Sequence, residues 1–252
     1  IGQMILVGFD GTRPDEDWPK LIRRQIADGE IGGVLYLPRN VESEPQVQAL
    51  NRSFLDSGAA VPPFIAVDQE GGRIERLGRG IGFPETPSAY DTGKLNRPAW
   101  AYSLYHNVAC ALRELDFNTN FGPVVDLRVQ PRNPVIAELD RSYSDDPEIV
   151  SEFATAFVEA HRQCGVATAL KHFPGHGSSL VDSHLALPDI SRSWSPVELT
   201  PFRTLIDRKL ADMVLVGHLV LARSDLGTTG HVPATLSSAI VAGLLRGRLG
   251  YD

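Results

Sequence analysis

Cysteine is scarce in this 252-residue chain, and long apolar stretches are missing from it. A membrane-spanning helix needs roughly 18 or more consecutive apolar residues, and no segment approaches that length. Basic residues are in deficit, because 24 lysines and arginines stand against 31 acidic residues and give a net charge of -7. No basic stripe runs along the chain. We therefore expect no nucleic-acid partner and no membrane segment, and we expect the excess acid on a solvated surface.

The two cysteines, Cys110 and Cys164, both fall in segments with a helical pattern. Such a pair is typical of buried free thiols, so we do not expect a disulfide. The chain also lacks His-Glu-x-x-His, and no Gly-x-Gly-x-x-Gly follows an expected strand, so the patterns of zinc and dinucleotide sites are absent. The sequence predicts no metal and no other cofactor.

Both ends have the features of a cut chain. The sequence begins Ile1-Gly2-Gln3-Met4 and stops at Gly250-Tyr251-Asp252, directly after a helical pattern and where a strand should begin. We expect a fragment of a longer protein. The absence of a leader therefore gives no information about the compartment.

Short apolar runs alternate with helical patterns along the chain, which predicts parallel strands joined by helical crossovers. We count six such runs, whereas a closed (β/α)8 barrel of roughly 250 residues has eight. A doubly wound open sheet is the alternative on pattern alone. We predict an α/β fold of the (β/α)8 type with about six of its eight units present. The runs are Met4–Phe9, Gly33–Leu37, Phe64–Val67, Asn120–Leu127, Val166–Leu170 and Met213–Val220.

Three helices have readable start signals. Asp146-Pro147-Glu148 places a proline and an acid in a first turn, and Gly165 is expected to end that helix. Ser195-Pro196-Val197-Glu198 fits a capping box. Asn96-Arg97-Pro98 is expected to open a helix that runs to about Leu115.

The most informative segment is Lys171–Gly177, which reads Lys-His-Phe-Pro-Gly-His-Gly and is followed by Asp182-Ser183-His184. Its proline and glycines exclude a regular helix, so we expect a shaped loop after the strand Val166–Leu170. Titratable residues on a loop that leaves a buried strand are what an α/β enzyme places around its substrate.

Asp182 and His184 are spaced to interact. An aspartate that accepts the imidazole proton fixes the tautomer and raises the basicity of the ring, and such a histidine can act as general acid and base. An exposed polar loop is the alternative interpretation. His172 and His176 are four residues apart, but the proline and glycine between them remove the helical geometry of a metal-ligand pair.

Polar side chains follow four of the expected strands, and in a barrel these strand ends share one rim. This arrangement predicts a pocket for a polar ligand. Asp68 and Glu70 are two carboxylates that either hold that ligand, bind a cation, or pair with Arg73 and Arg76. The Gly71-Gly72 step indicates close backbone approach or a positive φ. An isolated arginine such as Arg141 is by default a surface residue. The strand-end residues are Asp68, Asp126, Lys171 and His218.

Together these motifs resemble glycoside hydrolase family 3, specifically its β-N-acetylhexosaminidases of the NagZ type. The resemblance implies a catalytic barrel domain over residues 1–252. It also implies a retaining mechanism that releases terminal N-acetylglucosamine from peptidoglycan fragments or chitooligosaccharides. The segments that carry it are Ile1–Met4, Ile31–Val34, Val67–Arg73, Gly122–Asp126, Arg141–Ser144 and Lys171–His184.

By this resemblance, Asp182 and His184 form the acid/base dyad. His176 shapes the loop or the pocket, and the role of His218 is open. The positions that match those holding the sugar ring are Asp68, Arg76, Arg141, Lys171 and His172.

The family's nucleophile is an aspartate on the seventh strand, which we expect just beyond Asp252, in a protein of roughly 330–350 residues. Several alternatives stay open: phosphate as the acceptor, another β-glycoside as substrate, a non-catalytic sugar-binding module, and a metal-dependent barrel hydrolase. Relatives of this type are cytoplasmic in many Gram-negative bacteria and exported in others. The cytoplasm is favoured, and the oligomeric state and natural aglycone are open.

Overall fold

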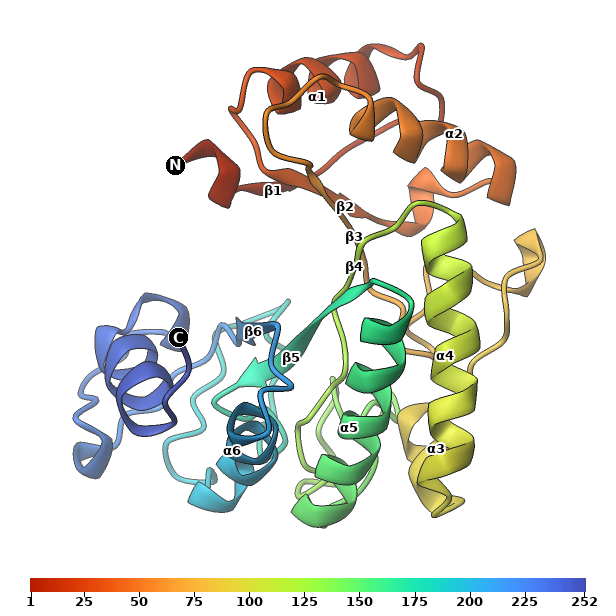
Figure 1. Ribbon diagram of the computed structural model, residues 1–252. Helices are drawn as coiled ribbons and strands as arrows, with labels where there is room; N and C mark the ends of the chain where they lie inside the picture. The colour runs from red at the N-terminus through yellow and green to blue at the C-terminus, as the bar shows by residue number, and fades with distance from the viewer.

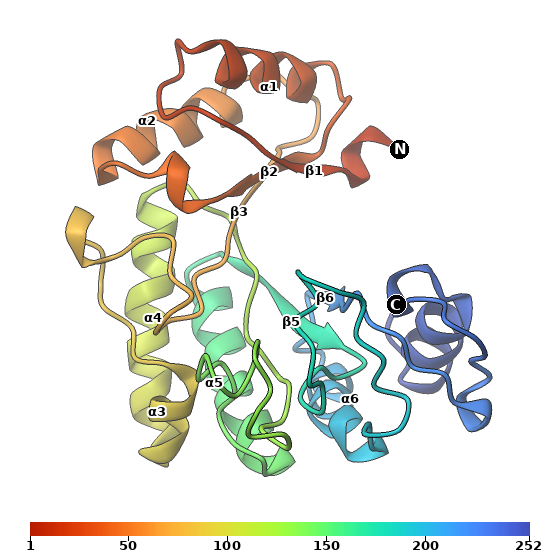
Figure 2. The ribbon, with the colours of Figure 1, turned by 180° about the vertical axis from the view of Figure 1, so that it is seen from behind.

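The computed structural model describes residues 1–252 and shows six parallel strands in one curled sheet (Figures 1 and 2). The strands pair in chain order from β1 to β6. This is the order of a barrel wall, whereas a doubly wound sheet reverses its order at a switch point. The predicted fold class and the count of six strands are confirmed. The strands are β1 (Leu6–Gly8), β2 (Gly33–Tyr36), β3 (Phe64–Val67), β4 (Thr119–Asn120), β5 (Ala167–Phe173) and β6 (Met213–Val216).

The helices lie on the outer side of the curled sheet, and α4 and α5 run side by side (Figures 1 and 2). No helix is long and apolar enough to cross a membrane. The α-helices are α1 (Asp17–Ala27), α2 (Glu44–Leu55), α3 (Ala89–Lys94), α4 (Pro98–Glu114), α5 (Pro147–Gln163) and α6 (Thr200–Asp207). A π-helix, η7 (Ala239–Arg248), follows β6. The short 3-10 turns are η1 (Gly2–Met4), η2 (Pro38–Asn40), η3 (Arg79–Ile81), η4 (Pro196–Leu199), η5 (Ser224–Leu226) and η6 (Ala234–Leu236).

The helix start signals operate as predicted. The Asp146 side chain accepts a hydrogen bond from the Glu148 amide at 2.8 Å and caps α5. The reciprocal contacts of a capping box join Ser195 and Glu198, although they open the 3-10 turn η4 immediately before α6. Helix α4 begins at Pro98, as expected.

Three strands end three or more residues away from the predicted position. Strand β6 stops at Val216, whereas we expected a strand to Val220. Strand β5 continues to Phe173, so Lys171 and His172 lie in the strand and not on the loop after it. Strand β4 is only Thr119–Asn120, whereas we expected a strand to Leu127. Pro123 has no amide hydrogen to give to a ladder, and the pairing resumes only as an isolated bridge between Val124 and Lys171.

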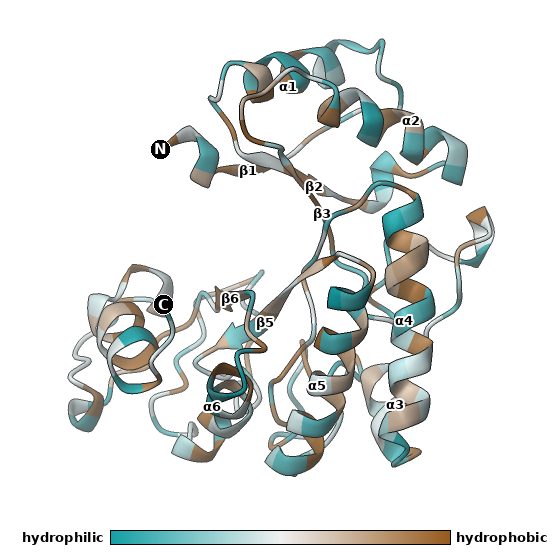
Figure 3. Cartoon of the chain, viewed as in Figure 1, coloured by the Kyte–Doolittle hydropathy of each residue, from teal (hydrophilic) through white to brown (hydrophobic).

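The core has two main parts. One lies between the first strands and α1, α2 and the end of α4, and the other lies between β5 and α4, α5 and α6. Strands β2 and β3 are apolar along most of their length, whereas the helices alternate between apolar and polar faces (Figure 3). This pattern is expected for strands covered by helices.

The prediction of free thiols is wrong, because Cys110 and Cys164 form a disulfide. Cys110 lies in the last turns of α4, and Cys164 is the C-cap residue of α5. Their Cα atoms are 5.1 Å apart, within the usual range for disulfides. A sequence separation of 54 residues gives no sign that these two helix ends meet, and only the packing of α4 on α5 brings them together.

Candidate active site

A cavity of about 450 Å³ opens at the carboxyl ends of the strands. Residues near or directly after the ends of β3, β5 and β6 line it, together with residues from the loops that follow β4 and β5. All eight residues to which the family resemblance gives a role in catalysis, sugar binding or the shape of the loop line this one cavity. They are Asp68, Arg76, Arg141, Lys171, His172, His176, Asp182 and His184.

Lys171 supplies the buried positive charge at the base of the cavity. Its side chain is only 3% exposed, and its Nζ lies 2.8 Å from Asp68 Oδ1 and 2.6 Å from Glu70 Oε1. Arg76 reaches the other oxygen of Asp68 at 3.4 Å. A buried lysine is costly unless it is paired, and these two carboxylates offset that cost and hold the side chain in place.

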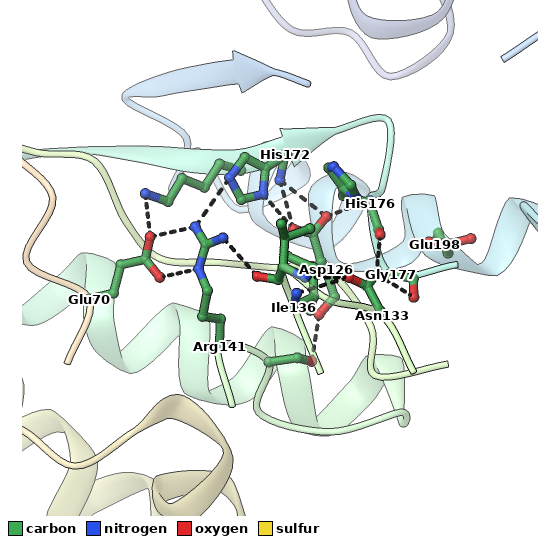
Figure 4. A network of polar contacts seen from close by, with 12 residues as sticks. Glu70, Asp126, Asn133, Ile136, Arg141, His172, His176, Gly177 and Glu198 are labelled. Carbon is green, nitrogen blue, oxygen red and sulfur yellow. Dashed lines mark hydrogen bonds and ion pairs between the residues drawn. The ribbon is translucent and has the colours of Figure 1, made fainter. Parts of the chain in front are cut away.

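Glu70 and Arg141 form a second enclosed ion pair (Figure 4), with side chains 6% and 10% exposed. Burial would raise the pKa of Glu70, but Lys171 and Arg141 outweigh it and lower the pKa to about 2. The expected partners of Glu70, Arg73 and Arg76, do not pair with it. The default of a surface position for Arg141 is also wrong, because Glu70 and the Val135 carbonyl draw it inward.

His172 contacts the fully buried carboxylate of Asp126 (Figure 4). Its Nδ1 lies 2.6 Å from Asp126 Oδ2, and its backbone amide also points to this carboxylate. Burial lowers the pKa of His172, Asp126 opposes the shift, and the charges of Arg141 and Lys171 add to it. A neutral ring that donates from Nδ1 leaves Nε2 as an acceptor beside the cavity.

Three buried side chains form hydrogen bonds with the backbone of the loop after β5. Asp126 accepts the His176 amide at 2.7 Å, and Asn133 donates to the carbonyls of His176 and Gly177 (Figure 4). Glu198, which is 1% exposed, accepts the Ser178 amide at 3.3 Å. Burial raises the pKa of Glu198 to about 7, despite the amides that point to it.

Gly175 shows why this loop contains glycine. It has a φ of +118°, and a Cβ there would lie 2.8 Å from Glu198 Cβ. Gly71 and Gly72 also have positive φ values, +103° and +59°, which was one of the two conformational reasons expected for this step.

Asp182 and His184 lie at the rim of the cavity. Asp182 Oδ1 is 2.8 Å from both His184 Nδ1 and the His184 backbone nitrogen. The hydrogen bond from the His184 amide lowers the pKa of Asp182, and the paired side chain adds to this effect. The imidazole is 80% exposed, so its Nε2 can reach a ligand from the solvent side.

Each of the remaining histidines lies in a different environment. His218 lines the cavity and its Nδ1 is 2.8 Å from Thr235 Oγ1. His161 is buried between Asn120 and the Phe157 carbonyl, and burial lowers its pKa to about 4. His106 lies beside the disulfide, and His231 is exposed.

Four residues support the site through contacts that the sequence did not predict. Glu70 and Asp126 were recognised as strand-end carboxylates, but nothing in the sequence identified their partners. Glu198 was visible only as part of a capping box. Asn133 had no signal beyond its position before a proline, which is a common turn pattern.

The fold and this cavity define an α/β protein of the barrel type with an ionised ligand pocket at its strand ends. The chain matches the N-terminal domain of glycosyl hydrolase family 3 over residues 1–252, and it therefore belongs to this family.

Relatives and solved structures agree with this assignment. A β-hexosaminidase of Tolumonas auensis is 36% identical, and the match covers 98% of this chain and 71% of that protein. β-Hexosaminidase A of Pseudoalteromonas piscicida is 34% identical, and this chain spans only 46% of its length. A family 3 β-N-acetylglucosaminidase from a Paenibacillus strain is similar with a TM-score of 0.89 and 36% identity, over 100% of this chain and 47% of that one. NagZ from Neisseria gonorrhoeae is similar with a TM-score of 0.85 and 27% identity, over 98% and 71%.

Proposed function

We propose that this chain carries the sugar-binding and acid/base residues of a retaining exo-β-N-acetylglucosaminidase. The observation that supports it most is the Asp182–His184 pair at the rim of a cavity whose floor holds Lys171 and Arg141. The names of the relatives, β-hexosaminidase and β-N-acetylglucosaminidase, point to the same reaction.

The cavity offers the sugar an ordered set of donors and acceptors. Lys171 and Arg141 donate only, Asp68 accepts only, and the His172 Nε2 accepts when the ring is neutral. Sugar hydroxyls do both, so each can bridge a cation and a carboxylate. Because the ion pairs already fix these side chains, little side-chain entropy is lost when the ring binds.

His184 would transfer the proton. Asp182 holds Nδ1, so Nε2 of the protonated ring gives its proton to the glycosidic oxygen as the bond to the anomeric carbon breaks. A carboxylate attacks that carbon and forms a glycosyl-enzyme. The neutral Nε2 then takes a proton from water, whose oxygen replaces the carboxylate and releases the sugar with retained configuration.

The attacking carboxylate needs a separate residue. Asp68 is paired with Lys171 and Arg76, Glu70 with Lys171 and Arg141, and Asp182 with His184. We propose that an aspartate outside residues 1–252 is the nucleophile, and that the ionised carboxylates of the cavity serve binding and positioning.

Hydrolysis of an aryl N-acetyl-β-glucosaminide tests this proposal, with the 252-residue chain assayed beside the full product of its coding sequence. We expect activity only in the longer protein, and His184→Ala in that protein should remove most turnover with little change in KM. Binding of N-acetylglucosamine to the 252-residue chain should weaken in Lys171→Ala. Sugar binding without turnover in either protein would favour a sugar-binding module, and turnover by the short chain would place the nucleophile within it.

The finer substrate class follows from the same site. We propose that peptidoglycan fragments and chitooligosaccharides are the natural sources of the terminal sugar, because only the non-reducing ring needs to enter the cavity. Rates on both substrates, measured with and without inorganic phosphate, separate these cases. Formation of a sugar 1-phosphate would identify a phosphorylase and overturn the hydrolase.

A further inference from the structure

A second cluster of reactive side chains lies outside the cavity, where α4 meets α5. His106, Cys110 and Cys164 each place a possible ligand atom within 4.8 Å of the others. None of the three lines the cavity. All three are half-buried, so small solutes can reach them from solvent.

The distance between Cys110 Sγ and the His106 ring is close to the ligand separation in a tetrahedral metal site, whereas the two sulfurs, which are bonded to each other, must move apart on reduction. Cys110 Sγ lies 3.8 Å from His106 Nε2 and 3.9 Å from Nδ1. Zinc bonds of about 2.3 Å to sulfur and about 2.0 Å to nitrogen place two such ligands roughly 3.6 Å apart in a tetrahedron. His106 and Cys110 are four residues apart on α4, so both face the same side of one helix. Cys164 approaches them from the C-cap of α5.

The imidazole of His106 has no other role in the structure. Its only side-chain polar contacts are those with Cys110 Sγ, and its ring stacks beside Tyr102 with centroids 6.1 Å apart. No carboxylate pairs with it. A half-buried histidine without a partner beside two cysteines is therefore free to take a ligand role.

We propose that this cluster is a redox-gated metal site, in which a thiolate-preferring divalent cation such as Zn²⁺ replaces the disulfide as the link between α4 and α5. A dithiol reductant transfers two electrons and two protons to the sulfur–sulfur bond, giving two cysteine thiols and the oxidised reductant. The cation then binds both sulfurs and the His106 ring and releases the two thiol protons. Three protein ligands leave the fourth position for water.

The two states would hold the same helix ends together under different conditions. A disulfide persists in an oxidising compartment and is reduced in the cytosol. Two free thiols do not link the helix ends, whereas a divalent cation binds both sulfurs as thiolates. The link between α4 and α5 would then survive the change of compartment.

Cobalt binding tests the proposal in the intact protein. The protein is reduced with dithiothreitol, freed of it anaerobically, and titrated with Co²⁺. We expect thiolate-to-metal charge-transfer absorbance at one equivalent in the reduced protein and none in the oxidised protein. The signal reports this site alone, because the chain has no other cysteines and the cavity histidines give no such band. Added Zn²⁺ should remove the band and raise the thermal midpoint of the reduced protein only.

Two variants identify the ligands. Cys110→Ser/Cys164→Ser should lose the band entirely. His106→Gln should weaken Co²⁺ binding by more than about 100-fold, the upper end of the losses seen when only outer-shell partners are removed, and the exposed His231→Gln is the matched control. Absence of the band in reduced wild-type protein with native circular dichroism would overturn the proposal. Equal affinity in His106→Gln would overturn the assignment of the third ligand.

Discussion

The guanidinium of Arg141 donates to both oxygens of Glu70, with Nε to Oε2 and Nη2 to Oε1 each at 2.8 Å. The two residues are 71 positions apart in the sequence. Lys171 adds a third contact to the same carboxylate. Glu70 therefore orients both cations of the cavity floor.

Glu70→Gln should be costly for this reason. Removing one partner of a buried ion pair costs about 3–5 kcal/mol, and here two cations lose their shared anion. We expect a lower free energy of unfolding in urea and weaker binding of N-acetylglucosamine by calorimetry. The exposed pair Arg79–Glu85 gives the control, because Glu85→Gln should change stability by less than about 1 kcal/mol. Equal effects of the two variants would contradict the proposed role of Glu70.

The stability that Glu70 contributes should depend on pH. Its folded pKa of about 2 lies below the ordinary value of 4.5. The contribution is therefore fully present above pH 4.5 and is lost as the pH falls toward 2. The difference in unfolding free energy between wild type and Glu70→Gln should shrink across this window, and a constant difference would place its origin in packing and not in charge.

Asp126→Asn should disturb His172 without touching the sugar. The Asp126 carboxylate accepts the amides of His172 and His176 and faces the His172 Nδ1. Asparagine offers one oxygen for these donors and adds two hydrogens of its own. We expect a mixture of His172 tautomers in nitrogen-15 spectra and weaker sugar binding. An unchanged tautomer in this variant would show that Arg141 or the backbone, and not Asp126, determines the tautomer of the His172 ring.

The sequence was sufficient to predict the sheet and, together with the family resemblance, most of the residues that line the cavity. Apolar runs and helix caps are local, and parallel strand ends must share a rim, so Asp68, Lys171 and His172 could be placed together without coordinates. The motif that contains Asp182 and His184 predicted the residues at the rim of the cavity. The sequence could not predict which side chains pair with each other.

Pairing depends on distances between segments that are remote in the chain. The partners of Glu70 lie 71 and 101 residues away, at Arg141 and Lys171, and the two cysteines are separated by 54 residues. Local pattern carries no information on such contacts. Nothing in the sequence indicated that Glu198 is buried, because its place in the capping box with Ser195 already explains why a glutamate stands at this position.

Glu198 should make the protein less stable as the pH rises. Its folded pKa of about 7 lies above the ordinary 4.5, so the folded state holds its proton more tightly than the unfolded state does. The contribution of Glu198 to the free energy of unfolding is complete below pH 4.5 and is lost as the pH rises through 7. This loss amounts to about 3 kcal/mol. We expect Glu198→Gln to be less sensitive to pH between 5 and 8 in urea unfolding. Glu159→Gln, at an exposed position on α5, is the control.

A persistent pH dependence in Glu198→Gln would assign the titration to another group. The charged group that faces Glu198 is Asp126, with the His176 ring nearby, and the amides of Ser178 and Ser195 point to it. Gln keeps an acceptor for one of these amides. The variant should therefore fold, and the comparison isolates the charge.

Reduction of Cys110–Cys164 should destabilise the protein when no metal is present. Linking residues 54 positions apart restricts the unfolded chain, and this is worth about 4 kcal/mol in the chain-entropy model, with typical values of about 2–4 kcal/mol. We expect dithiothreitol to lower the unfolding free energy of wild type by this amount in a metal-chelating buffer. Cys110→Ser/Cys164→Ser should start from the lower value and show no response to the reductant. A response in that variant would mean that dithiothreitol acts on something other than this bond, since the chain has no third cysteine.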